Sequence, residues 1–275
     1  AAPKDAHPAT RAANEAVRRS LRLDDRTDFA LAERGRVAPP ASPRVMSAAG
    51  FPVWNLDDYA FLADAVLELA QVRWRDGELD FARALVETML ARFEDAAGGG
   101  FFFTADDHEA LFHRAKGFGD EATPSGNGVA AFVLQRLGYL LGEPRWLEAA
   151  ERTLQASWPA LAKWPQNHAT SLAALEEWLA PPQAVILRGE ASAIARWRDD
   201  IDRIYAPRRV LLAIPSDAPD LPPALADKRP PPTAGGVVAY LCEGSQCSAP
   251  IDTLPELVRN LRLQIETSSP GTNDH

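Results

Sequence analysis

Apolar residues recur at spacings of three and four along the segment from Asp57 to Leu179. This spacing places them on one face of an α-helix, so it predicts a series of amphipathic helices. The expected helices are LDDYAFLADAVLELAQVRW, ELDFARALVETMLARF, GNGVAAFVLQRLGYLLG, EPRWLEAAERTLQASW and HATSLAALEEWLA. Such helices bury their apolar faces against one another, which makes the chain mainly α-helical.

Part of this helical series repeats. An offset of 65 residues pairs similar residues of two helices: Phe81 with Trp146, Ala84 with Ala149, Thr88 with Thr153, and Phe93 with Trp158. Each matched helix follows another apolar helix, so the repeating unit is a helical hairpin. Stacked hairpins build an α-solenoid or a closed α/α toroid. The alternative is a chance similarity between two alanine-rich amphipathic helices.

The spacing of the apolar residues changes after LAPPQ. Three short apolar runs, AVILRG, RVLLAIP and VVAYLCE, have the length and composition of buried β-strands. A helix, EASAIARWRDDIDRIY, lies between the first two, and this β-α-β order favours parallel pairing. We therefore expect a hairpin toroid segment over residues 1–180 and a small α/β element over residues 181–275. The latter holds a proline-rich loop, PSDAPDLPPALADKRPPPTAGG, and a last helix, LPELVRNLRLQ, before a frayed ETSSPGTNDH.

Composition narrows the class of protein. The net charge is −9 and no basic run is present, so neither a nucleic acid nor a membrane surface is expected as a partner. No apolar stretch approaches the roughly 20 residues that span a bilayer. The first residues, AAPKDAHPATRAANEAV, lack both an initiator Met and the apolar core of a signal peptide. We expect a cytoplasmic protein that is a processed product or a fragment, with one helix in ATRAANEAVRRSLRL.

The two cysteines, Cys242 and Cys247, are too few for a disulfide scaffold and favour a reducing compartment. They are interpreted as a buried or locally bonded pair. A zinc site needs four ligands, and a redox pair usually has two intervening residues rather than four. The motif GFGDEA has the spacing of a dinucleotide site but follows no strand. No metal and no cofactor are therefore predicted.

The stretch LFHRAKGFGDEATPSGN places many polar groups between two apolar segments. Ser125 or Asn127 is expected to cap the following helix. Capping does not explain Arg114, Lys116 and Asp120, which need partners if they face inward. Two interpretations remain open: a salt-bridged connection between hairpins, or the wall of a cavity that binds a polyol or carboxylate.

Two other segments contain candidate acid or base residues. Asp57, Asp58 and Tyr59 begin a helix, where aspartates interact favourably with free N–H groups and the helix dipole. If one of these adjacent carboxylates is buried, its pKa rises toward that of a general acid. His168 opens another helix and is either a partly exposed polar residue or, facing the same cavity as Asp58 and Lys116, a base.

Three segments resemble a known family: LDDYAFLADAVLEL, GGGFFFTADDHEALFHRAKGFGDEATPSGNGVAAFVLQRL and AYLCEGSQCSAPID. They are similar to the thioredoxin-domain-containing family of spermatogenesis-associated protein 20 and its bacterial relatives, over about Leu56 to Leu261. The resemblance implies a partial (α/α)6 toroid like N-acylglucosamine 2-epimerase and the six-hairpin glycosidases, with the thioredoxin-like domain and the first hairpins absent from this chain. The chain departs from the family pattern at Gly117, Glu121 and Gly128, where Glu, Gly and Ser are usual.

Two functional hypotheses follow, and the sequence does not decide between them. The first is a carbohydrate-active, epimerase- or glycosidase-like domain that takes a saccharide or polyol. Its catalytic candidates are Asp58, Lys116 and His168, and its substrate-binding candidates are Asp57, Tyr59, Arg114, Asp120, Ser125 and Asn127. Asp58 would act as acid or base, and Tyr59 would stack on a sugar ring. The second is a non-catalytic binding or scaffold module that supports a thioredoxin-like domain.

Overall fold

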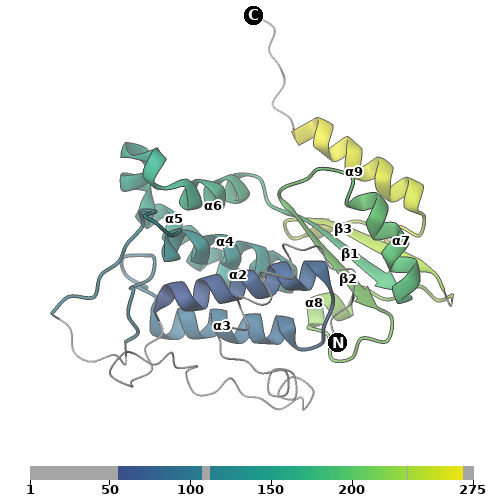
Figure 1. Cartoon of the computed structure of the whole chain (residues 1–275), viewed down its shortest axis with the longest axis horizontal. Coiled ribbons are helices and arrows are strands. Elements are labelled where there is room, and N and C mark those ends of the chain that lie inside the picture. The colour runs from purple at the N-terminus through teal and green to yellow at the C-terminus, as the bar shows by residue number, and fades with distance from the viewer. Residues whose placement is uncertain (1–54, 107–111, 234, 269–275) are drawn as a thin grey trace, which may run out of the picture. The chain divides into compact units, whose positions relative to one another are not determined.

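A computed structural model describes residues 55–106, 112–233 and 235–268 of the chain (Figure 1). The helices of the first part are α2 Leu56–Val72, α3 Glu78–Arg92, α4 Gly126–Leu141, α5 Pro144–Lys163, the short 3-10 helix η1 Pro165–Asn167, and α6 Ala169–Leu179. The later elements are β1 Gln183–Gly189, α7 Ala191–Ile201, β2 Arg209–Pro215, α8 Pro223–Ala226, β3 Val237–Glu243, β4 Gln246–Cys247 and α9 Leu254–Ser268. The mainly helical class is confirmed, whereas the helix expected over residues 9–23 lies outside the described residues.

Local sequence sets the helix ends. Asn55 and Asp58 form a capping box at the start of α2, which satisfies N–H groups that the first helical turn leaves unpaired. Pro144 occupies the first turn of α5, where its fixed φ suits the helix and its missing N–H costs nothing. Gly142 ends α4 in the left-handed conformation at φ 69°, which a residue with a Cβ adopts only with strain. The chain can therefore turn sharply between α4 and α5.

The helices pack as hairpins. Helix α2 packs against α3 and α4 against α5, while α4 also lies between α2 and α6. The starts of α2, α4 and α6 meet, because Asp57 contacts Gly126 and the carboxylate of Asp120 bonds to both Ser125 and Thr170. The three helices are therefore parallel neighbours, as the first members of successive hairpins would be. Closure into a toroid remains a prediction.

The matched helices α3 and α5 share a local feature. The hydroxyl of Thr88 donates to the carbonyl of Ala84 at 2.9 Å, and that of Thr153 donates to the carbonyl of Ala149 at 2.8 Å. The paired aromatic residues, however, differ in burial. Phe81 is 39% exposed whereas its counterpart Trp146 is fully buried. The matched threonines thus make the same bond, but the matched aromatic side chains differ in burial.

The sheet has the order β2-β1-β3-β4. Strand β1 runs parallel to β2, with α7 between them in the sequence, so the predicted β-α-β unit is confirmed. Strand β3 is antiparallel to β1 and forms a short hairpin with β4. Two helices in this part of the chain differ from expectation. The proline-rich segment is not all loop, because it contains α8 with a proline at its start, and α9 continues to Ser268, past the expected end.

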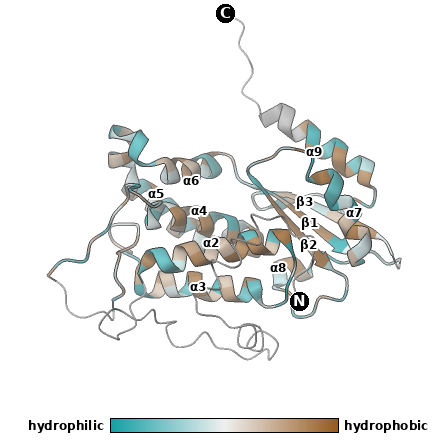
Figure 2. Cartoon of the chain, viewed as in Figure 1, coloured by the Kyte–Doolittle hydropathy of each residue, from teal (hydrophilic) through white to brown (hydrophobic). Residues whose placement is uncertain are grey.

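Each face of the sheet carries a separate core. Side chains such as Ile186, Leu212 and Tyr240 pack with α2, α3, α4 and α5. Their neighbours on the opposite face, such as Leu187 and Leu211, pack with α7 and α9. Apolar residues accordingly concentrate on the strands and on α2 and α4 (Figure 2). Burial on both faces explains why these strands read as continuous apolar runs. The proposed boundary near residue 180 stays a prediction.

Two further expectations concern the cysteines and the membrane. Cys242 and Cys247 are joined by a disulfide, so their interpretation as a locally bonded pair is confirmed. The reducing compartment inferred from the low cysteine content stays a prediction. Across the described ranges, every helix is too short or too polar to cross a bilayer.

Candidate functional site

The predicted polar residues gather where α2, α4 and α6 begin. Asp120 is central to this junction: its carboxylate accepts the N–H of Ser125 at 2.8 Å and the N–H of Thr170 at 2.9 Å. Partial burial pushes the pKa of Asp120 upward, but hydrogen bonds from Thr170 and Ser125 outweigh that effect and hold the pKa below its usual value. One ionised carboxylate thus joins the N-terminal ends of α4 and α6, where helix dipoles favour negative charge.

Ser125 and Asn127 complete the start of α4. The hydroxyl of Ser125 accepts the N–H of Gly128 at 3.3 Å, as an N-cap does. The amide of Asn127, only 2% exposed, accepts from the N–H of Phe101 at 2.7 Å. Its Nδ2 donates to the carbonyls of Phe101 and Gly117 at 2.9 and 2.8 Å. Both donor hydrogens of Asn127 are therefore used inside the protein.

Arg114 and Lys116 hold the loop that follows α3. The guanidinium of Arg114 donates to the carbonyl of Thr104 and lies over the ring of Phe102 at 4.2 Å. The ammonium of Lys116 donates to Asp95 Oδ2 at 2.7 Å and to the carbonyl oxygen of Gly99 at 2.8 Å. The hydrogen bond from Lys116 is the main reason why the pKa of Asp95 is lowered. Both cationic groups therefore have hydrogen-bond partners within this chain.

Asp58 and Tyr59 also have internal roles. The carboxylate of Asp58 accepts the N–H of Asn55 at 2.8 Å, as part of the capping box. Tyr59 is 3% exposed and packs against Phe93, with ring centroids 5.3 Å apart. A sugar ring can stack on Tyr59 only if the tyrosine leaves the core.

Asp57 differs from the rest of the junction. Its half-buried carboxylate lies against the start of α4, where a Cβ added to Gly126 would be 2.0 Å from Oδ1. Burial, and then the charge of Asp58, raise the pKa of Asp57. Within the described residues, no group donates a hydrogen bond to this carboxylate. Asp57 thus has the environment of a carboxyl group that can donate or accept a proton.

His168 lies just before α6 and is 5% exposed. Its Nδ1 is 2.8 Å from the carbonyl oxygen of Trp164. A carbonyl only accepts, so Nδ1 carries a proton in this contact, and Nε2 is an acceptor whenever the ring is neutral. Asp57, whose carboxylate has no donor among the described residues, and His168, with only Nδ1 bonded, are therefore the candidates best placed to exchange a proton.

A second charged cluster was missed in the sequence. Arg136 on α4 is 6% exposed and contacts Glu177 on α6, with Nη2 and Oε1 2.6 Å apart. It also reaches Glu68 on α2 at 3.1 Å, while Asp64 lies close enough to both carboxylates to feel their charges. The signal available was an arginine, next to a glutamine, within the mostly apolar run GVAAFVLQRLGYLL. In the residues with described side chains, no group of acidic, histidine or cysteine side chains is arranged to hold a metal ion.

Comparison with known proteins supports the family resemblance. No family model matches the chain. The sequence is 28% identical to human spermatogenesis-associated protein 20 over 216 residues, and 28% identical to the rat protein over 214 residues. Both alignments cover 75% of this chain and 27% of the relative. An uncharacterized protein of Caenorhabditis elegans is 24% identical over 203 residues, 73% of this chain and 27% of that protein.

Proposed function

We propose that this chain is a non-catalytic binding or scaffold module of a protein related to spermatogenesis-associated protein 20. The observation that carries the proposal is that four of the predicted polar side chains at the junction are already bonded within the chain. Arg114, Lys116, Asp120 and Asn127 direct their polar groups to partners within the chain. A ligand pocket needs convergent polar groups that are free to meet the ligand. The junction therefore acts as a connection between hairpins.

The module would present its helical hairpins as a rigid support. Three parallel helices share their N-terminal junction, and the same helical layer covers one face of the sheet. The resemblance suggests that the supported partner is a thioredoxin-like domain and that the hairpins form part of an (α/α)6 toroid. The chain spans 27% of the human relative, so a partner domain lying elsewhere in a longer protein is consistent with that alignment.

The second candidate is a carbohydrate-active site, and Asp57 with His168 is the observation in its favour. A glycosidase needs a carboxyl group whose raised pKa lets it act as a general acid, and an epimerase needs a base beside the substrate carbon. Asp57 has a raised pKa, and Nε2 of His168 is available as an acceptor. Asp58 and Lys116 would have to give up their present bonds to take part.

One experiment separates the two candidates. Thermal unfolding is measured with a panel of neutral sugars, amino sugars and sugar acids, for the parent chain, Asp57→Asn and Lys116→Ala. A ligand present at 100 times its Kd stabilises the folded state by about 2.7 kcal/mol, a shift that is readily measured. The scaffold proposal predicts no shift with any compound. A shift in the parent chain that Asp57→Asn abolishes would overturn it in favour of the saccharide site.

A further inference from the structure

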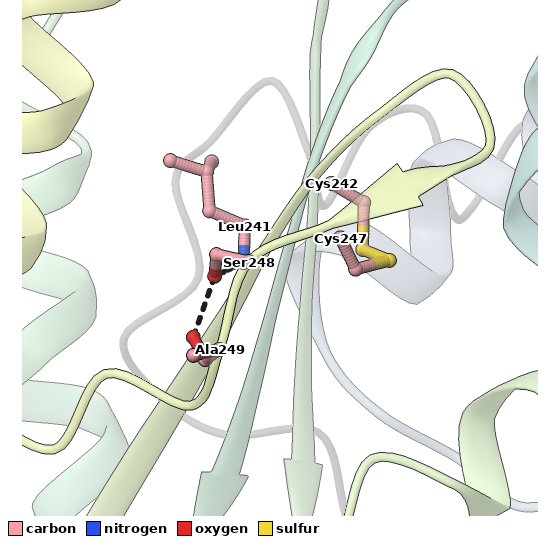
Figure 3. Close-up of a disulfide and its surroundings, with 5 residues drawn as sticks. All are labelled: Leu241, Cys242, Cys247, Ser248 and Ala249. Atoms are coloured by element: carbon pink, nitrogen blue, oxygen red, sulfur yellow. Dashed lines mark hydrogen bonds between the residues drawn. A yellow bond between two sulfur atoms is a disulfide. The ribbon is translucent and has the colours of Figure 1, made fainter.

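The disulfide lies at the end of a hairpin. Cys242 on β3 is directly opposite Cys247 on β4, and their Cα atoms are 3.9 Å apart. The strands are joined through Gly244 and Ser245, and Gly244 has a φ of 57°. A glycine with positive φ is typical of two-residue hairpin turns, whose twist matches that of the strands. Figure 3 shows the bond crossing between the two strands beside this turn.

The disulfide adds little to what the backbone already holds. The sequence separation of its cysteines is 5, so the disulfide closes a very small loop. The smaller the loop, the less entropy a disulfide removes from the unfolded chain. Strand β3 pairs with β1 along its entire length, Val237–Glu243, independently of β4. Beyond the hairpin, the hydroxyl of Ser248 accepts the N–H of Leu241 at 3.2 Å and donates to the carbonyl of Ala249 at 2.7 Å (Figure 3). The bond can therefore open while the sheet remains intact.

The two cysteines differ in access. Cys242 is 6% exposed, because β3 lies inside the sheet, whereas Cys247 is exposed on the outermost strand. Thiol–disulfide exchange requires a thiolate to reach one sulfur of the bond, so access selects the sulfur that is attacked. An external thiolate can approach Cys247 and is hindered at Cys242.

We propose that Cys242–Cys247 is a site of reversible thiol–disulfide exchange with a dithiol reductant. A thiolate of the dithiol attacks Sγ of Cys247, the bond between the cysteines breaks, and Cys242 leaves with the electron pair and takes up a proton. The second thiolate of the reductant then attacks the reductant's first sulfur in the mixed disulfide. This releases Cys247, which is also protonated. Two electrons pass from the dithiol, which becomes a disulfide, to the cysteine pair.

The turn of this hairpin lies close to the helical layer. The turn at Gly244 lies against Pro181 and Tyr139, since a Cβ added there would be 3.6 and 3.7 Å from them. Pro181 belongs to the segment that joins α6 to β1, and Tyr139 to α4. The exchange site therefore lies where the helical layer meets the sheet.

The first test asks whether the bond opens in the folded protein. The full chain is incubated with dithiothreitol without denaturant, alkylated with iodoacetamide and weighed by mass spectrometry, while far-UV circular dichroism records the helices. We expect at least Cys247 to be alkylated, with the circular dichroism unchanged. Alkylation that appears only after denaturant is added would show a purely structural disulfide and overturn the proposal.

The second test assigns the attacked sulfur. Cys242→Ser and Cys247→Ser each retain one thiol, so each serves as the matched control for the other. With oxidised glutathione, we expect Cys242→Ser to form the adduct at least tenfold faster than Cys247→Ser. Equal or reversed rates would refute the assignment. If either variant fails to fold, the parent chain is treated with reduced glutathione instead, and peptide mapping must locate the mixed disulfide on Cys247; an adduct on Cys242 would refute the same step.

Discussion

Asp64 shows how a single carboxyl group responds to its surroundings. It lies on α2, and the charges of Glu68, Arg136 and Glu177 act on it from α2, α4 and α6. Burial, and then the negative charge of Glu68, raise the pKa of Asp64 from 3.8 to about 6, against the opposing effect of Arg136. The folded protein therefore binds a proton at Asp64 more tightly than the unfolded chain does. Its contribution to stability is full below pH 3.8 and is lost as the pH rises through about 6.

Replacing Asp64 with Asn should remove this pH dependence, because the amide resembles the protonated acid. We expect Asp64→Asn to match the parent near pH 4 and to be more stable near pH 7 by at most about 3 kcal/mol, from 1.36 kcal/mol per pKa unit. Urea unfolding across this range measures the difference. Asp199→Asn, at an exposed position of α7, is the control and should show no such trend. A difference between Asp64→Asn and the parent that does not vary with pH would contradict the assignment.

At the scale of elements, the junction of α2, α4 and α6 depends on a few capping contacts. Asp120 is not part of any helix, yet it bonds to backbone N–H groups at the starts of two of them. Such N–H groups have no partner within their own helix, so a side chain must supply the acceptor. The order of the helices along the chain does not call for an acidic residue at position 120. The carboxylate of Asp120 is needed because the starts of α4 and α6 meet beside it.

Removing that carboxylate should weaken the junction. Asp120→Ala leaves the N–H groups of Ser125 and Thr170 without their acceptor, and we expect a loss of about 1–3 kcal/mol in the free energy of unfolding. Glu121→Ala removes the same charge from the exposed neighbouring position and should stay within about 0.5 kcal/mol of the parent. Chemical denaturation measures both variants. Equal losses would mean that the charge of this segment matters, rather than the two hydrogen bonds.

At the scale of the molecule, one core joins the helices to the sheet. Leu212 on β2 is fully buried and belongs to the same cluster as residues of α2, α3, α4 and α5. The backbone N–H of Leu211 also donates to the side chain of Gln71 on α2, at 3.2 Å. Elements that share a core usually unfold together, so the helical layer and the sheet should behave as one cooperative unit.

Leu212→Ala tests this coupling. Removing a fully buried leucine should destabilise the protein by about 2–5 kcal/mol. We expect hydrogen exchange to show the same loss of protection for the amides of α4 and of β1. Leu187→Ala is the matched variant for the opposite face of the sheet, where the core includes α7 and α9. Loss of protection in β1 alone would indicate that residues 181–275 unfold as a separate domain.

The sequence by itself determined the longer helices and the three main strands, and their order. The spacing of apolar residues before Leu179, and the continuous apolar runs after it, predicted the helices and the β-α-β unit, since both depend on local periodicity. The capping role of Ser125 followed from its place before an apolar helix. Each of these features depends on residues that are near one another in the chain.

The tertiary structure alone decided how the polar residues are used. Lys116 meets Asp95 and Arg136 meets Glu68 and Glu177, although no pattern in the sequence pairs them. The same packing leaves the carboxylate of Asp57 half-buried beside Gly126. Contacts between distant residues depend on how helices pack and on strand register. Local periodicity sets which face of a helix is buried, but not which side chain of the neighbouring element it meets.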